Sequence, residues 1–264
     1  MACSNRDFRI GLLVPAGNTT FEPDFISAFS SQISIHAHRV IAKRSYPYES
    51  HESMDDINEE AVKEVEKLAR ARVHFGAYGF TTATFYRGRV FAEQLEQRLT
   101  QVLGVPTVVP SLALLEALAF LKVKKISVVT PYPQWNNETL KMFLNDTPYE
   151  IVAFKGDERP KEVAKKNYFW HQSPDEAAAF IKEASHIGAD AVVLPCTAWR
   201  TFEVIEELEA DLNIPVVTAN QATIWSLARR ASIEYALRPR GTLFTKGNGE
   251  LGIGKDFLFP PTLL

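Results

Sequence analysis

A cysteine at the end of an apolar segment is the residue of this chain best placed to do chemistry. Cys196 follows the apolar residues 191–195 (AVVLP) and precedes a small polar residue, Thr197. A similar run, residues 75–83 (FGAYGFTTA), lies earlier in the chain, and Phe80 stands there at the place of Cys196, 116 positions before it. Two related lobes would then face each other with one thiol between them. Such a site could exchange a proton with a substrate from one side only.

The position of Cys196 predicts an activated thiol. It follows a proline at the end of a predicted strand, and a helix is predicted over residues 198–212. A helix N-terminus lowers the pKa of a thiol from about 8.5 toward neutrality. A free cysteine is also among the residues most often simply buried in a core, and the sequence leaves that alternative open.

Other candidate site residues come directly after predicted strands. Ligands of open parallel sheets bind beyond the carboxyl ends of the strands, so these positions are the informative ones. They carry hydroxyl and amide groups, which can stabilise carboxylates and enolates by hydrogen bonding. The residues that we predict to line the site with Cys196 are Pro15, Asn18, Phe80, Thr81, Thr82, Tyr132 and Thr197.

The elements that position these residues alternate between strand-like and helix-like segments, a pattern typical of parallel sheets covered by helices. A capping box at Ser173 and Glu176 predicts a helix over residues 174–187. The glycine-rich segment after residue 231 is expected to form loops. Strands are predicted at residues 8–14, 33–41, 73–78, 107–109, 126–130, 150–154, 191–194 and 216–218.

The pattern repeats along the chain. Val14-Pro15 after the first strand corresponds to Thr130-Pro131 after the fifth, again 116 positions apart. We therefore predict an α/β fold of two similar lobes, each a short parallel sheet flanked by helices, related by a pseudo-twofold axis with the site between them. The first lobe spans residues 1–121, completed by residues 231–264, and the second spans residues 122–230.

Composition excludes several classes of function. The 264 residues are 46% hydrophobic and 23% charged with a net charge of −3, which gives no general attraction to nucleic acid or to an anionic membrane. Two cysteines form no disulfide framework, and neither a signal peptide nor a membrane span is evident, so a cytoplasmic protein is expected. His36 and His38 lack acidic or cysteine partners at metal spacing, and no phosphate-binding glycine loop occurs. No metal and no cofactor are predicted.

Residues 10–23 (IGLLVPAGNTTFEP) resemble the opening of maleate cis-trans isomerases, and the two-lobed pattern resembles the wider aspartate/glutamate racemase superfamily. The resemblance covers about residues 8–230. It implies two similar parallel-sheet lobes with a cysteine from each on opposite faces of the substrate. Maleate isomerases have a cysteine at the place of Phe80, so covalent isomerisation would lack that nucleophile here.

Residues 81–88 (TTATFYRG) resemble the corresponding loop of arylmalonate decarboxylase, whose catalytic cysteine lies in the second lobe, where it matches Cys196. The resemblance implies that Thr81 and Thr82 bind an oxyanion, that Tyr132 contacts the substrate carboxylate, and that Thr197 adds a donor beside the thiol. Phe80 replaces a glycine of that enzyme and would make the pocket smaller.

Three functions remain open on the sequence. The first is a cofactor-free decarboxylase of a malonate-type acid, in which an enediolate is protonated by Cys196. The second is a maleate isomerase or racemase-like isomerase that uses one cysteine. The third is a non-catalytic protein that binds a small carboxylic or dicarboxylic acid. The sequence does not decide whether the chain forms a homo-oligomer.

Overall fold

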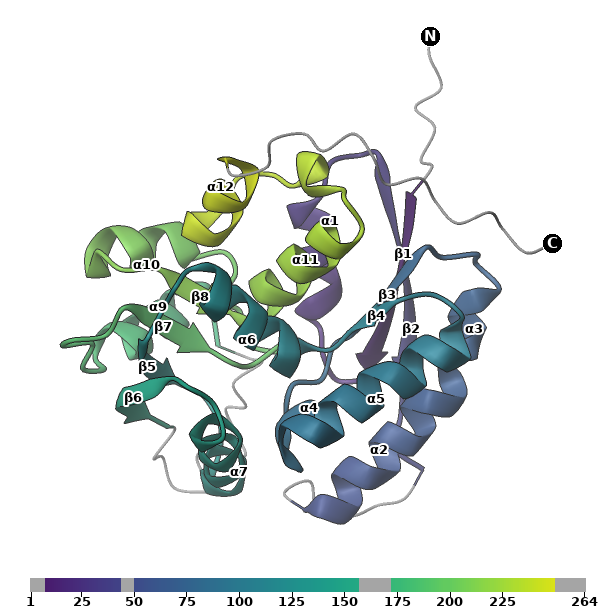
Figure 1. The fold of residues 1–264 in the computed structure, drawn as a ribbon, viewed down its shortest axis with the longest axis horizontal. Coiled ribbons are helices and arrows are strands. Elements are labelled where there is room, and N and C mark those ends of the chain that lie inside the picture. The colour runs from purple at the N-terminus through teal and green to yellow at the C-terminus, as the bar shows by residue number, and fades with distance from the viewer. Residues whose placement is uncertain (1–7, 44–49, 157–171, 250–264) are drawn as a thin grey trace, which may run out of the picture.

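Two parallel sheets of four strands each form the frame of the protein. The computed structural model describes residues 8–43, 50–156 and 172–249, and Figure 1 shows the two sheets in separate halves of this part of the chain. The first sheet has the order β2 (Ile33–Val40), β1 (Phe8–Pro15), β3 (Phe75–Tyr78) and β4 (Thr107–Val108). The second has the order β6 (Glu150–Lys155), β5 (Lys125–Val129), β7 (Ala191–Leu194) and β8 (Val216–Thr218).

The eight predicted strands are confirmed, each with ends within two residues of the expected ones. Central strands of a parallel sheet are buried on both faces and appear in the sequence as short continuous apolar runs, whereas the edge strand β2 alternates apolar and polar residues. All four residues of β7, for example, are buried.

The repeat is confirmed in the connectivity of the sheets. Each sheet has its first strand next to its second and third strands, and its fourth strand beside its third. β3 and β7 therefore occupy equivalent places, and so do the loops that follow them. Because all pairings are parallel, the carboxyl ends of the strands in each sheet lie at one edge.

Helices cover both sheets. Among the described residues, the helices before β5 are α1 (Phe21–Ala28), α2 (His51–Glu64), α3 (Glu66–Ala69), α4 (Thr82–Phe85), α5 (Gly88–Leu103) and α6 (Pro110–Phe120). Those after β5 are α7 (Gln134–Asn145), α9 (Pro174–Lys182), α10 (Ile205–Leu212), α11 (Ala219–Arg230), a short 3-10 helix (Glu234–Ala236) and α12 (Gly241–Gly249).

Two helix predictions were partly wrong. α9 has the predicted capping box, with Ser173 and Glu176 bonded reciprocally, but it ends at Lys182 and not at residue 187. α10 begins at Ile205, seven residues later than predicted. The backbone here is bonded to distant segments and not along a helix: the Thr197 carbonyl accepts from Asn220 and the Ala198 carbonyl from Thr20, while the Thr201 amide donates to the Trp199 carbonyl. Residues 196–204 consequently form an irregular turn.

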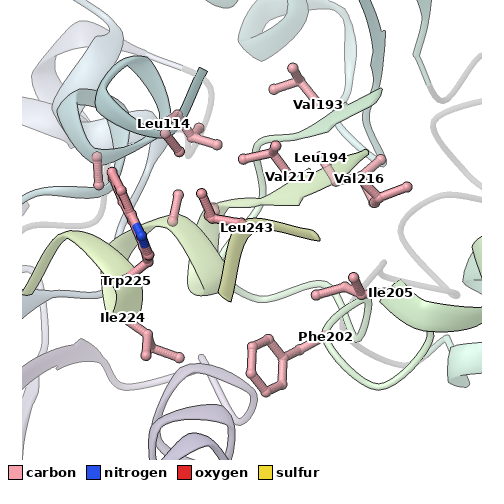
Figure 2. Packing of buried hydrophobic residues seen from close by; sticks show 14 of the residues in the cluster. Leu114, Val193, Leu194, Phe202, Ile205, Val216, Val217, Ile224, Trp225 and Leu243 are labelled. Atoms are coloured by element: carbon pink, nitrogen blue, oxygen red, sulfur yellow. The ribbon is translucent and has the colours of Figure 1, made fainter. Parts of the chain in front are cut away.

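One apolar core joins the two sheets. Buried residues of β1 and of β7 belong to the same cluster, and α6 and α11 pack against each other between the sheets (Figure 1). Figure 2 shows Leu114 of α6 and Trp225 of α11 in this core, together with Val217 of β8. The two lobes are therefore packed together by a shared interior and not only by a polar contact.

The segment after residue 231 differs from its prediction. α12 is a helix where loops were expected, and it packs on α10, α11 and β8, which are elements of the second lobe. Contacts with the first lobe include an isolated antiparallel bridge between Leu237 and Phe29. On either side of it, the Ser30 amide donates to the Ala236 carbonyl and the Arg238 amide to the Ala28 carbonyl, both at 2.8 Å. Residues 250–264 lie outside the described residues, and the lobe boundaries 1–121 and 122–230 stay a prediction.

Candidate active site

A cavity of about 260 Å³ lies where the loops after β1, β3, β5 and β7 meet. The structure brings all of the predicted site residues together around it. They come from both lobes, as the two-lobed prediction requires. The predicted residues that line the cavity are Pro15, Asn18, Phe80, Thr81, Thr82, Tyr132, Cys196 and Thr197.

Cys196 is 3% exposed and lies two residues beyond the end of β7. Burial raises the pKa of its thiol to about 12, although hydrogen bonds from the Ala198 amide, the Tyr132 side chain and the Trp199 amide act in the opposite direction. The predicted lowering of this pKa was wrong, because the thiol is buried and α10 does not begin beside the sulfur. At neutral pH Cys196 is a thiol that still carries its proton.

Phe80 occupies the equivalent position in the first lobe, two residues beyond β3. Its ring lies edge-on to Tyr78, with 6.5 Å between the ring centroids, and it lines the same cavity as Cys196. A phenyl ring neither donates nor accepts a proton. The cavity therefore has a thiol at one of two symmetric positions and an inert side chain at the other.

Two hydroxyl groups at the start of α4 are available to a ligand. The Thr81 hydroxyl is buried and has no hydrogen-bond partner among the described residues, although it lines the cavity. The Thr82 hydroxyl accepts a hydrogen bond from Asn136 Nδ2 at 3.1 Å, which leaves its own proton free to be donated. Neither hydroxyl proton has a described acceptor, and both residues line the cavity.

Asn18 and Thr197 line the cavity but already use their hydrogen atoms within the protein. Asn18 Nδ2 donates to the Gly79 carbonyl at 3.1 Å and to Thr197 Oγ1 at 3.3 Å, and Thr197 Oγ1 donates to the same carbonyl at 2.9 Å. The donor roles expected for these two side chains do not match this arrangement. They instead connect the loops after β1, β3 and β7.

Tyr132 is similarly engaged. Its hydroxyl donates to the Pro195 carbonyl at 2.7 Å, directly before Cys196. A bond from the same side chain also lowers the pKa of the Cys196 thiol. In this structure Tyr132 holds the cysteine loop, so the carboxylate contact implied by the resemblance would require this hydroxyl to change partners.

Sequence reasoning missed one wall of the cavity. Val40, at the end of β2, and Met54 and Ile57, one turn apart on α2, form apolar lining with the mostly exposed Ile41. The spacing of Met54 and Ile57 on one helix face was the available signal. Among the described lining residues, none carries a charged side chain.

Asn136 was also missed. It is fully buried at the start of α7 and bonds Thr82 across the lobes, and its Oδ1 has no partner in the described part of the chain. Its sequence context, a polar residue in the first turn of a helix, gave no sign of this contact.

Residues 8–43, 50–156 and 172–249 contain neither a metal-binding cluster nor a helix that could cross a membrane. No group of three or more histidine, cysteine, aspartate and glutamate side chains there could hold a metal ion. Within the same residues, every helix is too short or too polar to cross a bilayer.

Comparison with known proteins identifies relatives over nearly the whole chain. Maleate isomerase of Pseudomonas putida is 25% identical over 247 residues, which cover 90% of this chain and 97% of that protein. Arylmalonate decarboxylase of Bordetella bronchiseptica is 27% identical over 199 residues, 73% of this chain and 80% of that protein. Three further relatives are also maleate isomerases.

The fold is that of solved members of this group. A Nocardia farcinica maleate cis-trans isomerase variant, solved with a covalently bound succinylcysteine intermediate, superimposes with a TM-score of 0.78 at 21% identity, covering 90% of this chain and 98% of that one. The arylmalonate decarboxylase family matches residues 10–244. The chain thus belongs to the arylmalonate decarboxylase family, whose members are cofactor-independent decarboxylases or cis-trans isomerases.

Proposed function

We propose that the protein is a cofactor-free decarboxylase of a malonate-type carboxylic acid. The bond between the α-carbon and one carboxylate breaks, CO2 leaves, and the electron pair of that bond forms an enediolate with the remaining carboxylate. The Cys196 S–H bond then breaks as its proton passes to the α-carbon. The resulting thiolate recovers a proton from water.

The buried thiol of Cys196 on the cavity wall is the observation that carries this proposal. With a pKa near 12, Cys196 is an acid at neutral pH and not a thiolate nucleophile. An enediolate carbon is a much stronger base than a thiolate, so transfer of the thiol proton to it is favourable. A reaction that begins with thiolate attack would first have to remove this proton.

Phe80 supports a reaction that needs one acid. Racemisation through two opposed groups requires an acid and a base on either side of the α-carbon. Phe80, at the position equivalent to Cys196, can be neither. Decarboxylation followed by a single protonation has no such requirement.

The hydroxyls of Thr81 and Thr82 would stabilise the charge that develops on the enediolate. Donors fixed in place before the reaction are most effective where water is excluded. Both residues are 1% exposed and line the cavity, and the Thr81 hydroxyl has no other described partner. Binding an anion here would also satisfy an otherwise unpaired buried polar group.

The apolar wall would favour loss of CO2. A carboxylate beside Val40, Met54 and Ile57 loses its hydration without gaining a cation among the described lining residues. The neutral product CO2 carries no such penalty. The wall would thus raise the energy of the bound carboxylate relative to the transition state.

Incubation in deuterated water with a panel of disubstituted malonates and with maleate tests the proposal. We expect CO2 release from a malonate, one deuterium at the α-carbon of the product, and one enantiomer in excess. The control is Cys196→Ser, which retains the shape of the side chain and should lose turnover. Formation of fumarate from maleate, with every malonate unchanged, would contradict the proposal.

A second candidate is cis-trans isomerisation of a maleate-like diacid with Cys196 as the sole thiol. It is favoured by the maleate isomerases among the relatives. The maleate arm of the same experiment distinguishes it from decarboxylation. A protein that binds these acids and converts none would support the non-catalytic alternative.

A further inference from the structure

Asp24 is a carboxyl group buried behind the loop that carries Cys196. It lies on α1, is 4% exposed, and does not line the cavity. Its Oδ2 accepts a hydrogen bond from Asn220 Nδ2 at 2.6 Å. Burial raises the pKa of Asp24 well above its usual value, with the nearby Glu203 adding to the effect and the Asn220 bond, Arg240 and Arg200 opposing it.

Asn220 connects this carboxyl to the cysteine loop. It is the second residue of α11, is 2% exposed, and its Nδ2 also donates to the Thr197 carbonyl at 3.0 Å. In a continuous helix that carbonyl would accept from the Thr201 amide. The Thr201 amide instead donates to the Trp199 carbonyl at 2.8 Å. Asn220 thus replaces the bond that a helix would have made.

The shape of this turn determines what surrounds the sulfur. The Trp199 amide donates to the Cys196 carbonyl at 3.4 Å within this turn. The amides of Ala198 and Trp199 also lower the pKa of the thiol, so a change in the turn would change the surroundings of the sulfur. The Ala198 carbonyl accepts separately from Thr20 Oγ1 at 3.1 Å, and Thr20 is the residue directly before α1. α1 and α11 contact each other, so both anchors come from one packed pair of helices.

We propose that Asp24 and Asn220 are positioning residues for the Cys196 thiol, Asp24 acting through Asn220 and Asn220 through the Thr197 carbonyl. Asp24 fixes the orientation of the Asn220 amide, and the amide fixes the turn. The role rests on the proposed function of Cys196 as the proton donor. Neither residue contacts the substrate cavity.

Four variants test this series of contacts. They are Asn220→Ala, Asp24→Ala, the double variant that combines these two, and Asp24→Asn. We expect Asn220→Ala to lower kcat about 10- to 100-fold with a smaller change in KM, since a displaced reacting group costs rate more than binding. Asp24→Ala should act in the same direction, and the double variant should be no worse than Asn220→Ala alone. Asp24→Asn keeps an acceptor oxygen for Asn220 and should restore activity close to that of the wild type.

Hydrogen–deuterium exchange without substrate tests the same hydrogen bonds, from Asp24 through Asn220 to the Thr197 carbonyl, independently of the reaction. The Ala198 and Trp199 amides should exchange faster in Asn220→Ala and at the wild-type rate in Asp24→Asn. The matched control is Ser127→Ala, which removes a buried hydroxyl bonded to the Ser185 carbonyl at 3.0 Å, on β5 and outside the cavity lining. It should destabilise the fold without changing these two amides or the ratio of kcat to KM.

Three results would overturn the proposal. They are unchanged exchange at Ala198 and Trp199 in Asn220→Ala, additive losses in the double variant, and Asp24→Asn as impaired as Asp24→Ala. If no substrate is turned over, the proposed function fails, while the exchange experiment still decides whether Asp24 and Asn220 hold the turn.

Discussion

Phe80 and Cys196 occupy the same position in the two halves of the fold, each two residues beyond the third strand of its sheet and both on the wall of one cavity. The symmetry of the backbone is therefore not matched by the side chains. A thiol that retains its proton stands at one position, and a phenyl ring stands at the other. This difference leads to the first prediction.

Phe80→Cys should introduce a second proton donor on the side of the enediolate opposite Cys196. We expect the product to lose enantiomeric purity, because protonation can then occur on either face. Chiral chromatography of the product measures this directly. A single enantiomer, unchanged from the wild type, would show that residue 80 does not face the reacting carbon.

Thr81→Val should lower kcat without lowering the free energy of unfolding. The Thr81 hydroxyl is buried without a described partner, so replacing it with a methyl group should leave the free energy of unfolding unchanged or raise it by up to about 1 kcal/mol. If the hydroxyl stabilises the enediolate, kcat should fall about 100-fold. Urea denaturation and steady-state kinetics check the two halves of the prediction. Unchanged kcat would remove Thr81 from the oxyanion site.

Gly79→Ala should destabilise the protein through a clash with Phe21. A Cβ at position 79 would lie 2.7 Å from the Phe21 ring, and the Gly79 carbonyl is held by Asn18 and Thr197. We expect a loss of about 1–3 kcal/mol in the free energy of unfolding. A smaller side chain in Phe21→Leu should recover part of that loss. No recovery in the Gly79→Ala, Phe21→Leu double variant would mean that the strain lies in the backbone.

The raised pKa of Cys196 predicts a pH dependence of stability. The unfolded chain releases the thiol proton near pH 9, whereas the folded protein keeps it to about pH 12. Between these values the folded state binds more protons, so its stability is fully present below pH 9 and falls as the pH rises, by at most about 1.4 kcal/mol per pH unit.

Comparison with Cys196→Ala isolates this contribution from that of tyrosines and lysines. The difference in unfolding free energy between the two proteins should change between pH 9 and pH 11 in the direction that disfavours the wild type. A difference that stays constant over this interval would indicate that the thiol is not buried.

Central strands such as β7 could be predicted because they are short apolar runs, and the edge strand β2 because apolar and polar residues alternate along it. The site could be predicted because the loops after parallel strands converge. The surroundings of Cys196 were predicted wrongly. Local propensity over residues 198–212 favours a helix, but Thr20, 178 positions away, and Asn220 bond the carbonyls of the turn. Such distant contacts leave no local pattern, and the partners of Asn18, Tyr132 and Asn136 were missed for the same reason.

The role of Cys196 as the proton donor is tested most directly by the rate of CO2 release by Cys196→Ser on a malonate that the wild type decarboxylates. A serine hydroxyl is a far weaker acid than a thiol of similar shape, so we expect a loss of turnover of about 100-fold or more with the fold intact by circular dichroism. A variant that turns over at nearly the wild-type rate would contradict it, because the proton would then come from another group.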